Sequence, residues 1–201
     1  MAFEDVVFPE IACRGVTKSE GIPMQRIGNG TFQSRNTPVQ WGQFSYAISS
    51  VGMTNETKQL VKSFIRRRHY GLNSFKFVDP DHPVLVDEPM GHLSGDQWKF
   101  YLAEYNESGN LVPGVHPIFH PGTISLKVDG TPTAGTFSII NGEPILSIAG
   151  TSGFETVTVS GDYYICVVLG STLGWTISAL AESGPAAVRS ADFILQEVFE
   201  Y

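Results

Sequence analysis

The sequence of 201 residues is poor in charge and in cysteine. Charged residues make up 16% of it, against about 25% in a typical soluble protein. The surface must therefore be covered by uncharged polar residues, or part of it must be buried against other subunits. The two cysteines, Cys13 and Cys166, are too few for a disulfide framework, and we expect free thiols in a reducing compartment.

The sequence also lacks the features of proteins that hold DNA tightly or enter membranes. Its formal net charge is −7, which disfavours tight binding to duplex DNA because the phosphates must be neutralised by Lys and Arg. Residues 1–10 have neither the basic nor the apolar region of a signal peptide. No run approaches the ~20 apolar residues of a membrane span. We expect neither specific DNA binding nor membrane contact.

Common catalytic and metal-binding motifs are missing as well. There is no G-x-S-x-G, phosphate-binding loop, dinucleotide fingerprint, C-x-x-C or H-E-x-x-H. His116 and His120 have the spacing of two ligands on a helix, but the prolines around them forbid that helix. In an extended chain four residues span about 13 Å, too far to share one metal. We expect two surface histidines, no cofactor and no enzymatic activity.

One segment has the periodicity of a helix, and it begins after Thr54, a good N-cap, and ends before Gly71. The apolar residues of one helix face recur at spacings of one and four: Leu60, Val61, Phe64 and Ile65. After the helix, Phe75 and Phe77 alternate with Lys76 as in a strand. We expect four apolar residues of this region to anchor the fold: Leu60, Phe64, Phe75 and Phe77.

Two polar clusters flank these anchors. Asp79, Pro80 and Asp81 with the following histidine have the residue types of an acid–base or cation site, but Asp-Pro sequences favour a structural turn. The end of the helix is basic, with four residues that we interpret as a candidate subunit interface: Lys62, Arg66, Arg67 and Arg68. Complementation of the helix dipole explains these charges equally well, and nucleic-acid binding ranks third.

The rest of the sequence is typical of strands and turns. Apolar residues alternate on both sides of Asn141-Gly142, a strong hairpin signal. About ten short strands around one flanking helix predict a mainly-β sandwich or barrel. We expect a single domain over residues 1–201, in which residues 1–23 form an extended N-terminal arm and residues 97–119 a long hairpin excursion.

Short motifs in this order resemble the distal tail protein family of bacteriophages, in the short form found in gene-transfer-agent particles. The four matching segments, which span most of the chain, are Phe8-Pro9-Glu10-Ile11-Ala12 with Gly15, then Gly71 with Phe75-Lys76-Phe77-Val78-Asp79-Pro80-Asp81, then Pro121-Gly122-Thr123-Ile124 with Val128-Asp129-Gly130, and finally Leu195-Gln196-Glu197-Val198. They resemble the family's F-P-x-I-x-x-G, G-x-x-x-F-x-F-x-D-P-x-D, P-G-T-V-x-V-x-V-D-G and C-terminal segments.

The resemblance implies a structural role in the virion tail. Distal tail proteins assemble as hexameric rings that join the tail tube protein to the baseplate hub or tail tip, and DNA passes through the channel without specific binding. The resemblance therefore implies a tail-tube-like ring domain, made in the host cytoplasm and incorporated in the virion. An acidic channel wall would let DNA slide past by repulsion.

Two other functions fit the sequence. A tail tube or tail-terminator subunit is also a β-rich ring protein, and the hairpin at 97–119 would serve tube stacking. A carbohydrate-binding β-sandwich module at the tail tip would need exposed aromatic side chains for stacking. The candidates for such stacking are Trp41, Trp98, Tyr101 and Trp175.

Overall fold

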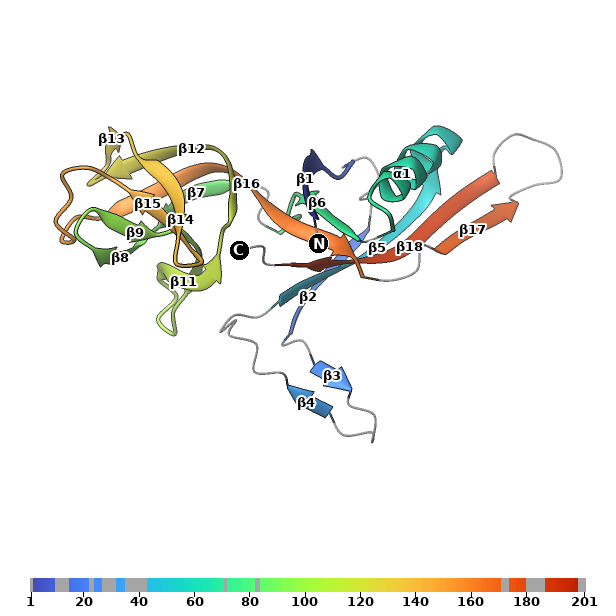
Figure 1. Ribbon diagram of the computed structural model, residues 1–201, viewed down its shortest axis with the longest axis horizontal. Helices are drawn as coiled ribbons and strands as arrows, with labels where there is room; N and C mark the ends of the chain where they lie inside the picture. The colour runs from blue at the N-terminus through green and yellow to red at the C-terminus, as the bar shows by residue number, and fades with distance from the viewer. Residues whose placement is uncertain are drawn as a thin grey trace. The chain divides into compact units, whose positions relative to one another are not determined.

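The computed structural model describes most of the chain and groups it into two compact units. Unit 1 comprises residues 1–78 and 166–200, and unit 2 comprises residues 79–165. The described residues are 2–9, 15–21, 24–26, 32–34, 43–70, 72–81, 84–170, 174–179 and 187–198. They form eighteen strands and one helix, so the expectation of a mainly-β fold with one helix is confirmed (Figure 1).

Unit 1 is built on a sheet with the strand order β1-β6-β16-β18-β5-β2. Its strands are β1 (Ala2–Val7), β2 (Val16–Gly21), β5 (Gln43–Met53), β6 (Asn73–Phe77), the end of β16 (Val157–Leu169) and β18 (Ala187–Glu197). The strand β17 (Gly174–Ala179) pairs with β18, while β3 (Met24–Arg26) and β4 (Phe32–Ser34) pair with each other. The expected N-terminal arm is thus extended but paired: β1 runs parallel to β6, and β2 runs antiparallel to β5.

The helix α1 (Asn55–Arg67) lies alongside β5 and β18 (Figure 1). The hydroxyl of Thr54 accepts a hydrogen bond from the backbone N–H of Thr57 at 3.1 Å, so Thr54 is the N-cap as expected. The buried residues of α1 are Thr57, Val61 and Ile65, which form a row of side chains spaced four residues apart. Leu60 is turned about 100° from Val61 and is 48% exposed. The expectation that Leu60 anchors the fold is therefore wrong.

The core of unit 1 is an aromatic cluster centred on Phe8. Its ring centroid lies 5.3 Å from that of Phe64, 5.9 Å from Phe75 and 6.1 Å from Phe77. The ring of Phe193 from β18 lies 5.8 Å away. These offset and edge-on arrangements are the favoured ones for aromatic rings. Because Phe8 comes from the N-terminal segment, the cluster fastens that segment to α1, β6 and β18.

Unit 2 consists of short antiparallel strands. They are β7 (Leu85–Pro89), β8 (Gly91–Ser94), β9 (Gln97–Lys99), β10 (Tyr101–Tyr105), β11 (Leu111–Pro117), β12 (His120–Val128), β13 (Thr131–Thr133), β14 (Thr136–Ile140), β15 (Glu143–Ser147) and residues 157–165 of β16. One sheet has the order β14-β15-β9-β8, β10 pairs with β11, and β16 pairs with both β12 and β7. The turn at Asn141-Gly142 has positive φ at both residues (52° and 81°), as a tight hairpin requires.

The number of strands exceeds the expected ten partly because residues 1–23, expected as an arm, contribute β1 and β2, and because additional short strands such as β8 and β13 form. The expected strand from Gln97 onward is interrupted at Phe100, so that β9 pairs with β15 and β8 while β10 pairs with β11. In the described part of the chain no sheet closes into a barrel, so the sandwich-like alternative stands. A single domain stays a prediction, since one domain can contain two compact units.

Candidate functional site

The four basic residues predicted as a subunit interface have different environments. Arg66 and Arg67 are exposed, and Lys62 is half-buried. Arg68 has a relative exposure of only 7%. The structure therefore separates Arg68 from the other three.

Arg68 fastens the first strand to the end of α1. Its Nη1 donates a hydrogen bond to the carbonyl of Phe64 at 3.1 Å, and its Nε lies 3.2 Å from a carboxylate oxygen of Glu4. Its guanidinium carbon lies 3.9 Å from the centroid of the Phe64 ring. Position 68 continues the buried row of Val61 and Ile65, which returns its side chain to the covered face of the helix. Including Arg68 in the interface was therefore wrong.

The exposed arginines and the exposed large apolar side chains of α1 and of the turn that follows it are together called the α1 surface. Its members are Leu60, Arg66, Arg67, Tyr70 and Leu72. The three apolar side chains are 48%, 57% and 68% exposed, in that order along the chain. The Nε of Arg66 donates a hydrogen bond to the hydroxyl of Tyr70 at 3.0 Å. Arg and Tyr are enriched where proteins contact one another, so this surface has the composition of an interface.

The backbone at the end of α1 adds a second feature. His69 and Tyr70 have φ values of 50° and 55°, a left-handed conformation that is uncommon outside glycine and costs free energy. Two hydrogen bonds hold this turn, from the N–H of Tyr70 to the carbonyl of Ile65 and from the N–H of His69 to that of Arg66. The strained turn holds the Tyr70 ring beside Arg66.

The acidic turn after β6 is structural. The carboxylate of Asp79 accepts a hydrogen bond from the N–H of Asp81 at 3.0 Å and from the hydroxyl of Tyr163 at 3.3 Å. Asp79 is fully buried, whereas Pro80 and Asp81 are exposed. His82 lies outside the described residues. The carboxylate of Asp79 thus stabilises the bend by accepting hydrogen bonds. This agrees with a structural turn rather than with an acid–base or cation site.

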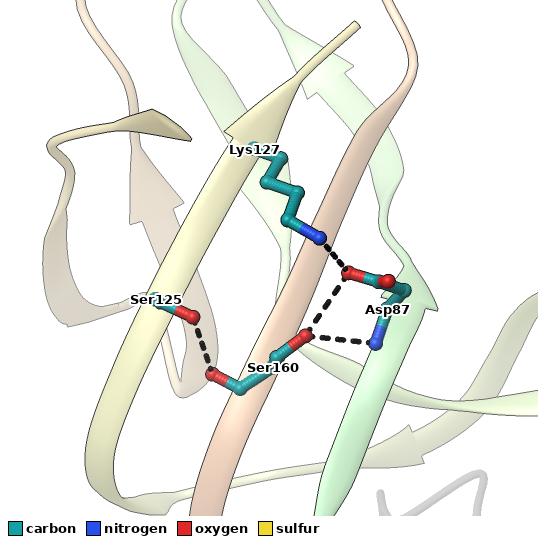
Figure 2. Close-up of polar contacts among 4 residues, drawn as sticks. All are labelled: Asp87, Ser125, Lys127 and Ser160. Atoms are coloured by element: carbon teal, nitrogen blue, oxygen red, sulfur yellow. Dashed lines mark hydrogen bonds and ion pairs between the residues drawn. The ribbon is translucent and has the colours of Figure 1, made fainter. Parts of the chain in front are cut away.

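A polar cluster that the sequence did not reveal joins three strands of unit 2 (Figure 2). The carboxylate of Asp87 on β7 lies 2.8 Å from the Nζ of Lys127 on β12 and accepts a hydrogen bond from the hydroxyl of Ser160 on β16 at 3.1 Å. The N–H of Asp87 donates to that same hydroxyl at 2.9 Å. The hydrogen bonds from Lys127 and Ser160 hold the pKa of Asp87 below its ordinary value.

This cluster is suited to binding strands together rather than to catalysis. The hydroxyl of Ser160 faces a carboxylate that Lys127 already neutralises, which is a poor arrangement for removing its proton. The hydroxyl of Ser125 donates to the backbone carbonyl of Ser160 at 3.4 Å. Each side chain thus connects neighbouring strands. Asp87, Lys127 and Ser160 are far apart in the sequence, so only the strand pairing brings them together.

His116 and His120 are the two histidines expected at the surface. His116 on β11 is only 6% exposed, so the expectation that it lies at the surface is wrong. His120 begins β12 and is half-buried. Among the described residues, no group of three or more His, Cys, Asp and Glu side chains is placed to hold a metal ion. The one described helix is too short and too polar to cross a membrane.

Two of the four aromatic residues expected as candidates for sugar stacking are buried. Trp98 and Tyr101 are buried, at 2% and 4% exposure. The indole N–H of Trp98 donates to the hydroxyl of Thr151 at 3.0 Å. Trp41 lies outside the described residues, and Trp175 is described only as part of β17. The side chains that the structure describes therefore do not form the expected stacking platform.

Comparison with known proteins leaves the site to be interpreted from its own residues. No known family model matches the chain, and no curated protein sequence matches it. The α1 surface is the feature that best combines exposure, charge and an unusual backbone conformation.

Proposed function

We propose that this chain is a virion structural protein, a distal tail connector that assembles as a ring between the tail tube and the baseplate or tail tip. In this role it has no enzymatic activity, its partners are other copies of itself and the neighbouring tail proteins, and DNA passes through the ring without specific binding. Its location is the virion tail. The hexameric form is the one that the resemblance implies.

The observation that carries the proposal is the α1 surface. A monomer has no evident need to expose Leu60, Tyr70 and Leu72 beside Arg66 and Arg67, whereas a subunit of an assembly buries such a surface against its neighbour. The left-handed conformation of Tyr70 is a cost that an interface role explains. The low charged fraction of the sequence, 16%, agrees with burial between subunits.

The positions of the family-like motifs support the same proposal. Phe8 from the N-terminal motif packs on Phe75 and Phe77 from the second motif. Leu195 from the C-terminal motif is fully buried in β18 of the same unit. Two motifs that are far apart in the sequence thus share one aromatic core, and a third lies on a strand of the same unit, as is expected if all three belong to one ring domain.

The two alternative functions would require different exposed surfaces on the protein. A tail tube or terminator subunit would also form rings, but a tube protein would stack them into tubes through surfaces such as the β10–β11 hairpin. A carbohydrate-binding module is less well supported because Trp98 and Tyr101 are buried. We therefore keep the distal tail connector as the proposed function.

The first prediction tests the α1 surface by charge reversal. The double variant Arg66→Glu with Arg67→Glu should remain folded, since each reversal at the helix end costs about 0.3–1 kcal/mol through the dipole. It should no longer assemble, because both exposed cations of the contact are replaced by anions. Sedimentation velocity would show a monomer in place of the large species formed by the wild-type chain.

A matched control separates charge from shape. Arg66→Lys with Arg67→Lys keeps both charges but loses the planar guanidinium groups, and we expect a weaker yet detectable assembly. If the glutamate variant sediments like the wild-type chain, the arginines complement the helix dipole and do not contact a neighbour.

A further inference from the structure

The most exposed large apolar side chain among the described residues is Phe154 of unit 2. It lies between β15 and β16 and is 96% exposed. Single exposed apolar residues are common on proteins. Phe154 is distinguished by the loop that carries it, which has several internal hydrogen bonds.

The loop is braced on both sides of Phe154. The carboxylate of Glu155 accepts hydrogen bonds from the N–H and the hydroxyl of Ser152, at 2.9 Å and 2.8 Å, and from the N–H of Gly153 at 2.9 Å. These bonds lower the pKa of Glu155 to about 2, so the carboxylate is ionised and the brace intact at neutral pH. Phe154 is held at the tip of a preformed turn.

The ends of the loop are fixed to the strands below. At one end the hydroxyl of Thr151 donates to the carbonyl of Ile148 at 2.9 Å and accepts from the indole of Trp98. At the other end Thr156 and Asp129 exchange two hydrogen bonds, at 2.8 Å and 2.9 Å. A loop whose backbone is held in this way loses little conformational entropy on binding, which favours its use at an interface.

Unit 2, which carries Phe154, has a large excess of acidic residues. Residues 79–165 contain eleven Asp and Glu residues but only two Lys and no Arg, a formal charge of −9 within a chain whose total is −7. Both lysines are in ion pairs, Lys127 with Asp87 at 2.8 Å and Lys99 with Glu143 at 3.8 Å. A partner that covers Phe154 must therefore supply the positive charge, together with apolar side chains to contact the ring.

The chain itself carries a surface with those properties. The α1 surface combines two exposed arginines with the exposed side chains of Leu60, Tyr70 and Leu72. Neither Arg66 nor Arg67 makes an ion pair with an acidic residue of the described chain. Unit 1 has a formal charge of +2 because unit 2 holds −9 of the total of −7. The α1 surface is basic, unit 2 is acidic, and each carries exposed apolar side chains.

We propose that the Phe154 loop of one copy docks on the α1 surface of a second copy. The inference rests on the proposed function and deepens it by naming the surface that the α1 arginines meet. Such a contact joins unlike surfaces, so it is heterologous and propagates head to tail until the ring closes. Phe154 serves as the apolar anchor, and the carboxylates around it orient the neighbouring Arg66 and Arg67.

The test is a charge swap between copies. Variant A is Arg66→Glu with Arg67→Glu, and variant B is Asp96→Lys with Thr156→Lys, which places cations beside the Phe154 loop. Asp96 and Thr156 are exposed, and their hydrogen bonds to Ile148 and Asp129 use backbone groups that lysine retains. We expect each variant alone to be monomeric, because its contact pairs like charges.

Mixing A with B should restore assembly. In an alternating ring the acidic α1 surface of A meets the basic loop of B, and the basic α1 surface of B meets the acidic loop of A. Glu107→Lys at the tip of the β10–β11 hairpin is the control for added positive charge and should assemble normally. Restored rings support the contact; a mixture that stays monomeric, from variants that each fold, overturns it.

A second variant probes the apolar anchor without changing charge. Phe154→Ser should weaken association about 30-fold, as expected for a hot-spot residue. The exposed Ile139 on β14 offers a matched control, and Ile139→Ser should leave association unchanged. If the wild-type chain assembles while Phe154→Ser and variant B assemble equally well, this inference fails and the proposed function stands. If the wild-type chain itself never assembles, both fail.

Discussion

Glu155 is the residue whose protonation the structure ties most directly to a local conformation. Hydrogen bonds from the side chain and N–H of Ser152 lower its pKa from 4.5 to about 2. A depressed pKa means that the folded loop prefers the ionised carboxylate. The contribution of Glu155 is therefore complete above pH about 4.5 and is lost as the pH falls through about 2.

This gives a prediction at the residue scale. In a carboxyl-detected NMR titration, the Glu155 signal should titrate near pH 2, and the amide signals of Ser152 and Gly153 should shift with it. Glu155→Gln should abolish these shifts and increase the mobility of Phe154. A Glu155 signal that titrates near 4.5 would mean that the loop is not braced in solution.

Arg68 shows why single residues are hard to assign from sequence. It stands in a run of three arginines, and nothing in the run distinguishes the buried member from the exposed ones. The difference arises because Glu4, which lies far away in the sequence, comes within 3.2 Å of its Nε when β1 pairs with β6. Local sequence gives the charge, but the partner depends on strand pairing.

At the scale of elements, the prediction concerns the aromatic core of unit 1. Phe75 is fully buried against Phe8 and Phe64. Phe75→Ala should lower the free energy of unfolding by about 3–5 kcal/mol, because it removes a buried ring and leaves a cavity. Urea denaturation of the assembly-deficient Arg66→Glu, Arg67→Glu background would measure this on monomers.

A matched control comes from the end of the helix. Leu72 is 68% exposed, so Leu72→Ala in the same background should change the free energy of unfolding by no more than about 0.5 kcal/mol. Equal effects of Phe75→Ala and Leu72→Ala would contradict the described core.

Features that depend on neighbouring residues could be predicted from the sequence. Features that depend on packing against residues distant in the sequence could not. The cap at Thr54 and the turn at Asn141-Gly142 depend on a few neighbouring residues, and both lie where the pattern placed them. Leu60 fits the helix periodicity but is 48% exposed, whereas Val61 and Ile65 on the neighbouring row are fully buried. Which apolar residues of a helix become buried therefore depends on the strands and side chains that pack against it.

At the scale of the whole molecule, the chain separates its charges between two units. The acidic residues of the segment 79–165 could have been counted in the sequence, but the boundaries of that segment become visible only when residues 166–200 return to the sheet of residues 1–78. A basic surface on one unit and an acidic unit in the same chain favour association between unlike surfaces.

Assembly into a ring is the central claim, and electron microscopy of the purified wild-type chain tests it most directly. Negative-stain images at micromolar concentration should show closed, single-layered rings with a central opening, and class averages should have sixfold symmetry. Fields that contain only monomers, at concentrations where the chain is fully folded, would contradict the claim.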